Sequence, residues 1–377
     1  MKLTTLTTIS PLDGRYHEKT EELSSFFSEY ALIKTRVEVE SLYLIALSGI
    51  GVIRKLSKKE KVFLENFGKN LSLADCEKVK DIENETRHDV KAMEKTFRMM
   101  LKRTTLKELT EWIHFGLTSE DINNLSYRLM IKRATKTIML PALDTIIITL
   151  LDRAEKHKAL PMLARTHGQN AVPTTVGKEL IIFADRLEKQ ISELSNKKLC
   201  GKLSGAVGNF NALQFTYPDV DWISFSQKFI ASLDLEPNLF TTQINTYEDV
   251  TSYLQNYHRI NSILIDFDQD IWRYISDEWF IQVAKKGEIG SSTMPQKVNP
   301  IDFENSEGNL GMANTMTEYF ARKLPVSRLQ RDLSDSTVMR NVGVIFGYSL
   351  VAYKSILIGL SRISVNEEKI LSTLEKD

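Results

Sequence analysis

Apolar residues recur at three- and four-residue steps along most of this chain, the spacing that lines one face of an α-helix. The two longest such stripes are Val176, Leu180, Phe183, Leu187, Ile191 and Leu194, and Tyr257, Ile260, Leu264, Phe267, Ile271 and Tyr274. The second stripe alternates steps of three and four, as the seam of a helical bundle does. The pattern therefore predicts an all-α protein in which long helices pack side by side.

Weaker patterns and helix breakers predict the remaining elements. These are a helix from Ser24 to Ser48, short helices and turns at residues 49–68, a long helix at residues 122–160 interrupted at Pro141, and a helix at residues 309–324. We expect a smaller, mostly helical N-terminal domain at residues 1–114, a central long-helix bundle at residues 115–360, and the start of a C-terminal domain at residues 361–377.

Three polar segments interrupt the long helices. They are TSED at residues 118–121, RTHGQ at residues 165–169, and GEIGSSTMPQKVNPIDFENSEGN at residues 287–309. The last carries Gly and Pro in close succession, which predicts a loop rich in hydroxyl, amide and cationic side chains. A polar, glycine-hinged loop between long helices is typical of a functional site, and an ordinary solvated connection is the alternative.

Several polar residues outside the long loop are candidates for binding anions. Thr118 and Ser119 precede acidic residues at a helix start, which suits an anion site and equally a plain N-cap. Arg331 and Arg340, with hydroxyls between them, suit a phosphate or carboxylate. The alternative, left open, is that Arg328 and Arg331 pair with the nearby Asp332 and Asp335.

The histidines differ in their surroundings. His167 lies in a loop between helices, which favours a chemical role, whereas His157 and His258 lie within helical patterns and are interpreted as structural. Arg87, His88 and Asp89 form a compact charged group that is, taken alone, typical of a solvated helix face.

Composition narrows the class of protein. Lys and Arg number 49 and Asp and Glu number 49, so the zero net charge gives no field for nucleic acid or an anionic membrane. No apolar run is judged long enough to span a membrane. The two cysteines are far apart and unaccompanied by metal-ligand spacing, so we expect reduced thiols, no metal, and a cytoplasmic location.

The segment SSTMPQKVNP resembles the signature loop of the fumarase/aspartase superfamily. Along its length the chain resembles the bacterial-type adenylosuccinate lyase family in SPLDGRY, RHDVKA, HFGLTSEDINNLS, RTHGQ, TTQI, GEIGSSTMPQKVNPIDFENSEGNLG and LPVSRLQRDLSDSTVMRN. This resemblance implies the superfamily's central helical bundle and a homotetramer whose sites are shared between subunits. It also implies elimination of fumarate from adenylosuccinate, giving AMP, and from SAICAR, giving AICAR, without a cofactor.

The resemblance also implies residue roles. Ser291 would be the general base, His167 the general acid, and Lys297 would stabilise the carbanion. The phosphate side would be held by Arg15, Tyr16, Arg331, Ser336 and Arg340, and the succinyl side by Thr118, Ser119, Gln243, Lys297 and Asn299. Arg87, His88, Asp89, Ser292 and Asn305 would line the rest of the site.

Three departures from the family pattern keep other readings open. Gln296 stands where many adenylosuccinate lyases have His, and Asn170 where Pro is frequent. The family normally continues for another small helical domain, so the resemblance implies either truncation or a dispensable domain. The alternatives are argininosuccinate lyase, another fumarate-releasing member, or a non-catalytic helical scaffold.

Overall fold

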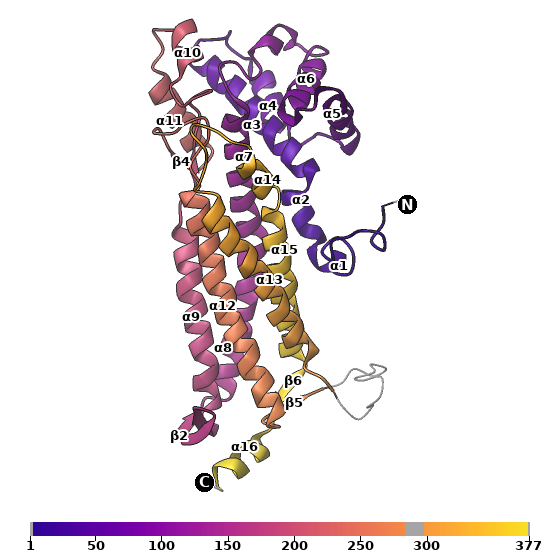
Figure 1. Ribbon diagram of the computed structural model, residues 1–377, viewed down its shortest axis with the longest axis vertical. Helices are drawn as coiled ribbons and strands as arrows, with labels where there is room; N and C mark the ends of the chain where they lie inside the picture. The colour runs from indigo at the N-terminus through magenta and orange to yellow at the C-terminus, as the bar shows by residue number, and fades with distance from the viewer. Residues whose placement is uncertain (1–2, 284–297, 376–377) are drawn as a thin grey trace.

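The computed structural model describes residues 3–283 and 298–375, and shows a long helical bundle that widens at one end (Figure 1). The bundle consists of α7 (Ser119–Ala134), α8 (Leu140–Lys156), α9 (Val176–Asn196), α12 (Glu248–Ser276), α13 (Ile301–Lys323) and α15 (Val342–Ser361). The predicted class, a long-helix bundle with further helices at its N-terminal part, is confirmed.

The wider end combines most of the N-terminal helices with two helices from the middle of the chain, whereas α1 lies beside α15 (Figure 1). The N-terminal helices are α1 (His17–Thr20), α2 (Ser24–Phe27), α3 (Glu29–Gly49), α4 (Lys58–Phe67), α5 (Leu73–Thr86) and α6 (Asp89–Leu101), with 3-10 turns at Glu21–Leu23 and Lys107–Trp112. The two helices from the middle of the chain are α10 (Asn211–Thr216) and α11 (Trp222–Ser232). Two further short helices are α14 (Ser334–Met339) and, at the opposite end of the protein, α16 (Glu367–Leu374).

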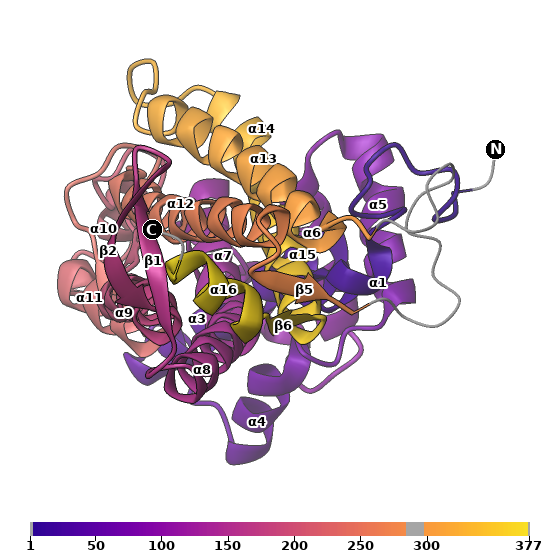
Figure 2. The same ribbon diagram turned by 90° about the horizontal axis from the view of Figure 1, so that it is seen from below.

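In the described part of the chain, three two-stranded sheets join these helices. The sequence pattern did not predict these sheets. They pair β1 (Pro161–Thr166) with β2 (Gln169–Thr175), β3 (Cys200–Gly201) with β4 (Glu236–Pro237), and β5 (Phe280–Gln282) with β6 (Ile363–Val365). The β1–β2 pair is antiparallel and closes through His167 and Gly168, so the segment predicted as a loop is the tip of a β-hairpin. Figure 2 shows this hairpin beside α16 at one end of the bundle.

The helix α12 forms the predicted seam of the bundle. Tyr257, Ile260 and Leu264 are at most 1% exposed, and Phe267 and Ile271 continue the buried face. The α12 helix packs on α9 and on α13, and α13 packs on α15. The stripe predicted from spacing alone is therefore the core of the bundle.

The helices α7 and α8 form one continuous helical stretch of 38 residues, Ser119–Lys156. Pro141 was predicted to interrupt this helix, which is wrong: it occupies the first turn of α8, where its missing N–H costs little. A π-helical turn at Thr135–Met139 precedes it and accommodates the changed hydrogen bonding. At about 1.5 Å per residue, this stretch is about 57 Å long.

Among residues 3–283 and 298–375, two helical stretches are long and apolar enough to cross a membrane by length and composition, Ser119–Lys156 and Ser334–Ser361. The sequence-based statement that no apolar run approaches that length is therefore wrong. In the second stretch, 67% of the apolar window is buried inside the protein, because α15 is an interior helix in contact with α13 and α8. Interior helices are apolar on all sides for the same reason that membrane helices are.

Candidate functional site

The start of α7 is fixed by Asp121. One carboxylate oxygen of Asp121 lies 2.6 Å from the ammonium nitrogen of Lys202, and the other accepts the backbone N–H of Thr118 at 2.8 Å. The backbone N–H groups of Ser204 and Gly205 also donate to it. Both charged side chains are fully buried. This network holds Thr118 and Ser119, both half-buried, at a rigid helix N-terminus.

Beneath this helix start lies a cluster of buried polar groups. Arg331 Nη1 lies 3.2 Å from Glu120 and 3.6 Å from Asp335. The Tyr247 hydroxyl lies 2.9 Å from Asp335 and 3.4 Å from Glu120. Burial raises the pKa of Glu120 to about 7, and the neighbouring Asp335 adds to this effect while Arg331 opposes it. Of the pairings left open above, Arg331 with Asp335 and Arg328 with Asp332 are both found, each at 3.6 Å.

A second cluster joins the wide end of the protein to α14. Asp89 pairs with Arg36 at 2.7 Å and with Arg340 at 3.0 Å. Burial alone would raise the pKa of Asp89, but the two guanidinium groups hold it below its ordinary value. Asp89 is therefore an ionised bridge that positions Arg340, whose side chain is 42% exposed.

The triplet at residues 87–89 is a helix boundary and not a helix face. Arg87 ends α5 in the left-handed region, with φ 51°, and its side chain is exposed. His88 caps α6, where its Nδ1 accepts the backbone N–H of Lys91 at 3.2 Å. Because Nδ1 accepts this hydrogen bond, the neutral ring would carry its proton on Nε2.

A third group connects the N-terminal turn to the bundle. Asn305 of α13 donates to the Tyr16 hydroxyl at 3.0 Å and accepts from the Ser355 hydroxyl at 2.9 Å. Lys19 donates to the same Ser355 at 2.9 Å. Burial lowers the pKa of Lys19, while Asp302 opposes that effect. Tyr16 and Asn305 are thus brought together, as the resemblance implied for residues of one site.

His167 lies far from these groups along the chain's long axis. It occupies the exposed tip of the β1–β2 hairpin with φ 55°, followed by Gly168 with φ 72°. Thr118 caps one end of the 38-residue helical stretch, and the hairpin follows the other end (Figure 1). Within one chain, His167 and the α7 N-terminus therefore do not share a site.

The remaining predicted residues are more dispersed. Arg15 is exposed ahead of α1, Gln243 is half-buried in the segment before α12, and Asn299 directly precedes Pro300 at the start of α13. Ser336 is half-buried on α14, one helical turn before Arg340. Ser291, Ser292 and Lys297 lie outside the described residues, as does Gln296.

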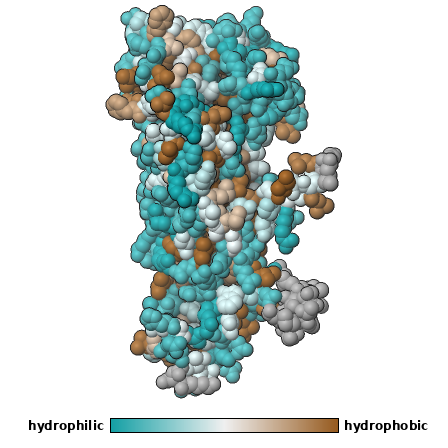
Figure 3. Space-filling view, viewed as in Figure 1, coloured by the Kyte–Doolittle hydropathy of each residue, from teal (hydrophilic) through white to brown (hydrophobic). Residues whose placement is uncertain are grey.

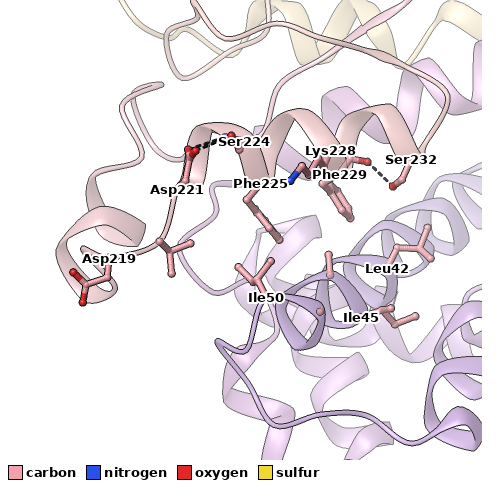
Figure 4. Close-up of a pocket in the computed structure, with 13 residues that line it drawn as sticks. Leu42, Ile45, Ile50, Asp219, Asp221, Ser224, Phe225, Lys228, Phe229 and Ser232 are labelled. Carbon is pink, nitrogen blue, oxygen red and sulfur yellow. Dashed lines mark hydrogen bonds between the residues drawn. The ribbon is translucent and has the colours of Figure 1, made fainter.

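A further pocket in the described part of the chain lies elsewhere. It has a volume of about 680 Å³ and separates α3 from α11, with Phe225, Phe229 and Ile50 on its walls (Figure 4). None of the predicted site residues lines it. A smaller pocket of about 250 Å³, between the N-terminal turns and α15, is lined by Arg340. Within residues 3–283 and 298–375, no group of three His, Cys, Asp or Glu side chains is arranged to hold a metal ion.

Sequence reasoning missed the residues that support the site from beneath. Glu120, Tyr247 and Lys202 are at most 4% exposed and contact predicted site residues or the groups that hold them. One signal was present: Glu120 and Asp121 both follow Ser119 at a helix start, where only one acid is needed for the cap.

Comparison with known proteins identifies the class of protein to which this chain belongs. Residues 14–314 match the sequence family described as Lyase, and residues 327–377 match the family described as Adenylosuccinate lyase C-terminal. The fold is similar to the 3-carboxy-cis,cis-muconate lactonizing enzyme of Pseudomonas putida, with TM-score 0.77 and 18% identity over 94% of this chain and 78% of that one. The β-carboxy-cis,cis-muconate cycloisomerase of Acinetobacter calcoaceticus gives TM-score 0.74 at the same identity and coverage. This chain is a lyase of the fumarase/aspartase superfamily.

Curated relatives define the family more closely. The chain is 46% identical to the adenylosuccinate lyase of Haemophilus influenzae over 100% of this chain and 84% of the relative. It is 48% identical to that of Dictyostelium discoideum and 46% identical to that of Escherichia coli K12, over 100% of this chain and 83% of each relative. The chain belongs to the adenylosuccinate lyase family, whose members are C–N lyases.

Proposed function

We propose that this protein releases fumarate from adenylosuccinate to give AMP, and from SAICAR to give AICAR. The observation that carries the proposal is identity of 46–48% over the whole chain to adenylosuccinate lyases. The test is fumarate release by the purified protein, followed by absorbance, with adenylosuccinate, SAICAR and argininosuccinate as separate substrates. Release from argininosuccinate alone would favour the alternative lyase, and release from none of the three would favour a scaffold.

The proposed chemistry is a β-elimination. Removing a proton beside a carboxylate places a second negative charge next to an existing one, so electrostatic stabilisation is the largest requirement. We assign that role to Lys297, the general base to Ser291 and the general acid to His167, following the family motifs. His167 lies exposed at the hairpin tip, where its imidazole N–H can donate to a nitrogen leaving group.

The backbone at His167 supports a functional role. Both turn residues of the hairpin have positive φ, a geometry that favours Asn, Asp or Gly at the first position. A histidine there departs from the preferred turn chemistry without packing into the core. The exposed tip leaves the His167 side chain available for a chemical role.

We further propose that the active enzyme is a cytoplasmic homotetramer whose sites combine segments of different subunits. The α7–α8 stretch is about 57 Å long, with Thr118 at one end and the hairpin that carries His167 after the other, so one chain does not bring the two residues together. Bundle helices also expose apolar side chains that a partner can cover, namely Ile148, Leu151, Ile181, Trp272, Met312 and Tyr319. Figure 3 shows apolar patches on the otherwise hydrophilic surface of the bundle.

If the sites are shared between subunits, mixing two inactive variants should restore activity. His167→Ala and Arg331→Ala should each be nearly inactive alone, but mixing them in equal amounts under subunit exchange should restore activity. If each site takes His167 from one subunit and Arg331 from another, about a quarter of the sites are intact after random mixing. The measurement is adenylosuccinate turnover before and after exchange. Each variant exchanged with itself is the control, and no recovery in the mixture contradicts shared sites.

The Arg340 side chain supports binding of the phosphate. Arg340→Ala should weaken AMP binding about ten- to a hundredfold, since a charge-assisted hydrogen bond contributes about 1.5–3 kcal/mol. Fumarate inhibition should barely change. The fold should be retained, because Asp89 keeps its 2.7 Å pair with Arg36. Calorimetric titration with both ligands measures the effect.

A matched control for that substitution is Arg133→Ala. Arg133 is also 42% exposed and is paired with a carboxylate, Glu38, at 2.8 Å, but it touches none of the predicted site residues. Its loss should leave AMP binding unchanged. Lys297→Ala should show the reverse pattern to Arg340→Ala, harming binding of fumarate. Unchanged AMP affinity in Arg340→Ala would remove the main reason for preferring a nucleotide substrate over argininosuccinate.

A further inference from the structure

Three segments distant in sequence place a compact set of polar groups under the predicted substrate site. Glu120 is 4% exposed, and Asp335 and Tyr247 are each 3% exposed. Arg331 reaches both carboxylates through the same nitrogen, at 3.2 Å and 3.6 Å, and its own side chain is 22% exposed. Because only one nitrogen is engaged in these contacts, the guanidinium retains donors for a ligand.

The cluster adjoins residues predicted to bind the substrate on both sides. Glu120 directly follows Ser119, and Asp335 directly precedes Ser336. A change in charge within the cluster therefore changes the electrostatic potential at Ser119 and at Ser336. Arg331, the cationic member, is itself predicted to contact the phosphate side.

The charges in this buried space are unbalanced. Two carboxylates, on α7 and α14, face the one guanidinium of Arg331, while the Tyr247 hydroxyl bridges the carboxylates. Arg128 of α7 is the other nearby cation, but it makes two contacts of 2.8 Å to Asp249 and so is already matched. Burial raises the pKa of Glu120 to about 7, so a proton exchanges here near neutral pH.

We propose that Glu120 is a positioning residue for Arg331, and that it takes up a proton from solvent when an anionic group of the substrate binds at that guanidinium. The inference rests on the proposed function, since it assumes that Arg331 meets the nucleotide phosphate. Without ligand, the Glu120 carboxylate orients Arg331. With ligand, the anion competes for the same cation, and a second buried negative charge becomes unfavourable. The protonated carboxyl group still accepts from Arg331 and turns its O–H toward the Tyr247 hydroxyl.

Proton uptake can be counted directly. AMP is titrated at pH 8 in buffers of different ionisation enthalpy, because the phosphate, with a second pKa of about 6, is then fully ionised and releases almost no proton itself. If the bound anion raises the pKa of Glu120 by about one unit, binding takes up about 0.4 of a proton. AMP affinity should fall about fivefold between pH 7 and pH 9, because uptake becomes less favourable as protons become scarcer.

The decisive variant is Glu120→Gln, which should abolish both the uptake and the pH dependence. Because glutamine mimics the protonated carboxyl, this variant should bind AMP at pH 8 at least as tightly as the parent. The control is Glu94→Gln: Glu94 is also buried and pairs with Arg98 at 2.9 Å, but it contacts none of the predicted site residues. Its proton uptake should equal that of the parent.

A second comparison tests positioning. Glu120→Ala deletes the acceptor as well as the charge, so it should bind AMP about tenfold more weakly than Glu120→Gln. Equal affinities of the two variants would contradict the positioning role. Binding of AMP without proton uptake, or unchanged uptake in Glu120→Gln, would overturn the coupling while the lyase activity stands. If the parent neither binds AMP nor releases fumarate from adenylosuccinate, the proposed function fails and this inference fails with it. Should the alanine variant not fold, the proton count of the glutamine variant decides.

Discussion

His167→Ala should lower the turnover of adenylosuccinate by about two to four orders of magnitude, the scale expected when a positioned acid or base is removed. The side chain is exposed at the tip of the β1–β2 hairpin, so its loss should leave folding intact. The effect should therefore fall on the catalytic rate while thermal stability is unchanged. Steady-state kinetics and thermal unfolding of the same preparation measure the two quantities.

Two other histidines provide controls for the same substitution. His258 of α12 lies 3.2 Å from Glu318 of α13 and is partly exposed, so His258→Ala should leave turnover nearly unchanged. His157 ends α8 and is 7% exposed, so His157→Ala should lower stability and not the catalytic rate. Equal losses of turnover in all three variants would contradict the assignment of the acid to His167.

Ser291→Ala should abolish measurable turnover while substrate binding largely remains, because the substitution removes only the proposed base. A serine hydroxyl ionises reluctantly in water, and it becomes an effective base only in a dry site beside a cation, the role proposed for Lys297. The assignment comes from the sequence motif, since residue 291 lies outside the described residues. Rapid-quench kinetics and equilibrium binding of adenylosuccinate to the variant separate chemistry from binding.

The neighbouring serine is the natural control for this experiment. Ser292→Ala removes an identical hydroxyl one residue later and should affect binding more than the chemical step. Near-normal turnover in Ser291→Ala together with lost turnover in Ser292→Ala would reassign the base. Retained turnover in both variants would mean that the base comes from another segment.

The sequence predicted most of what depends on local pattern. The stripe through Tyr257, Leu264 and Phe267 was expected to be a bundle seam, and these residues are almost fully buried in α12. The resemblance carried by SSTMPQKVNP and the other motifs led to the family that the comparisons show. Both predictions are correct because a helical face and a sequence motif depend on residues that are close together in the chain.

Local rules gave a wrong answer where a neighbouring turn changed the outcome. Pro141 was expected to break a helix, but a π-helical turn ahead of it allows the helix to continue. The triplet at residues 87–89, taken alone, was typical of a solvated helix face, although Arg87 takes a left-handed conformation and ends α5. Arg87 is not one of the residues that usually adopt a left-handed helix cap, so the sequence carries no local sign of that helix end.

By itself the sequence determined the class of fold, the positions of the polar segments and the family. Only the tertiary structure decided which polar groups meet: Glu120 with Arg331, Asp89 with both Arg36 and Arg340, and Asn305 with Tyr16. The structure also decided that His167 and Thr118 lie at opposite ends of one long helical stretch. The reason is that the chain carries 49 acidic and 49 basic residues, which allow very many possible ion pairs. Which of these pairs form depends on the packing of apolar faces from segments far apart in the chain, and that packing is a property of the whole fold.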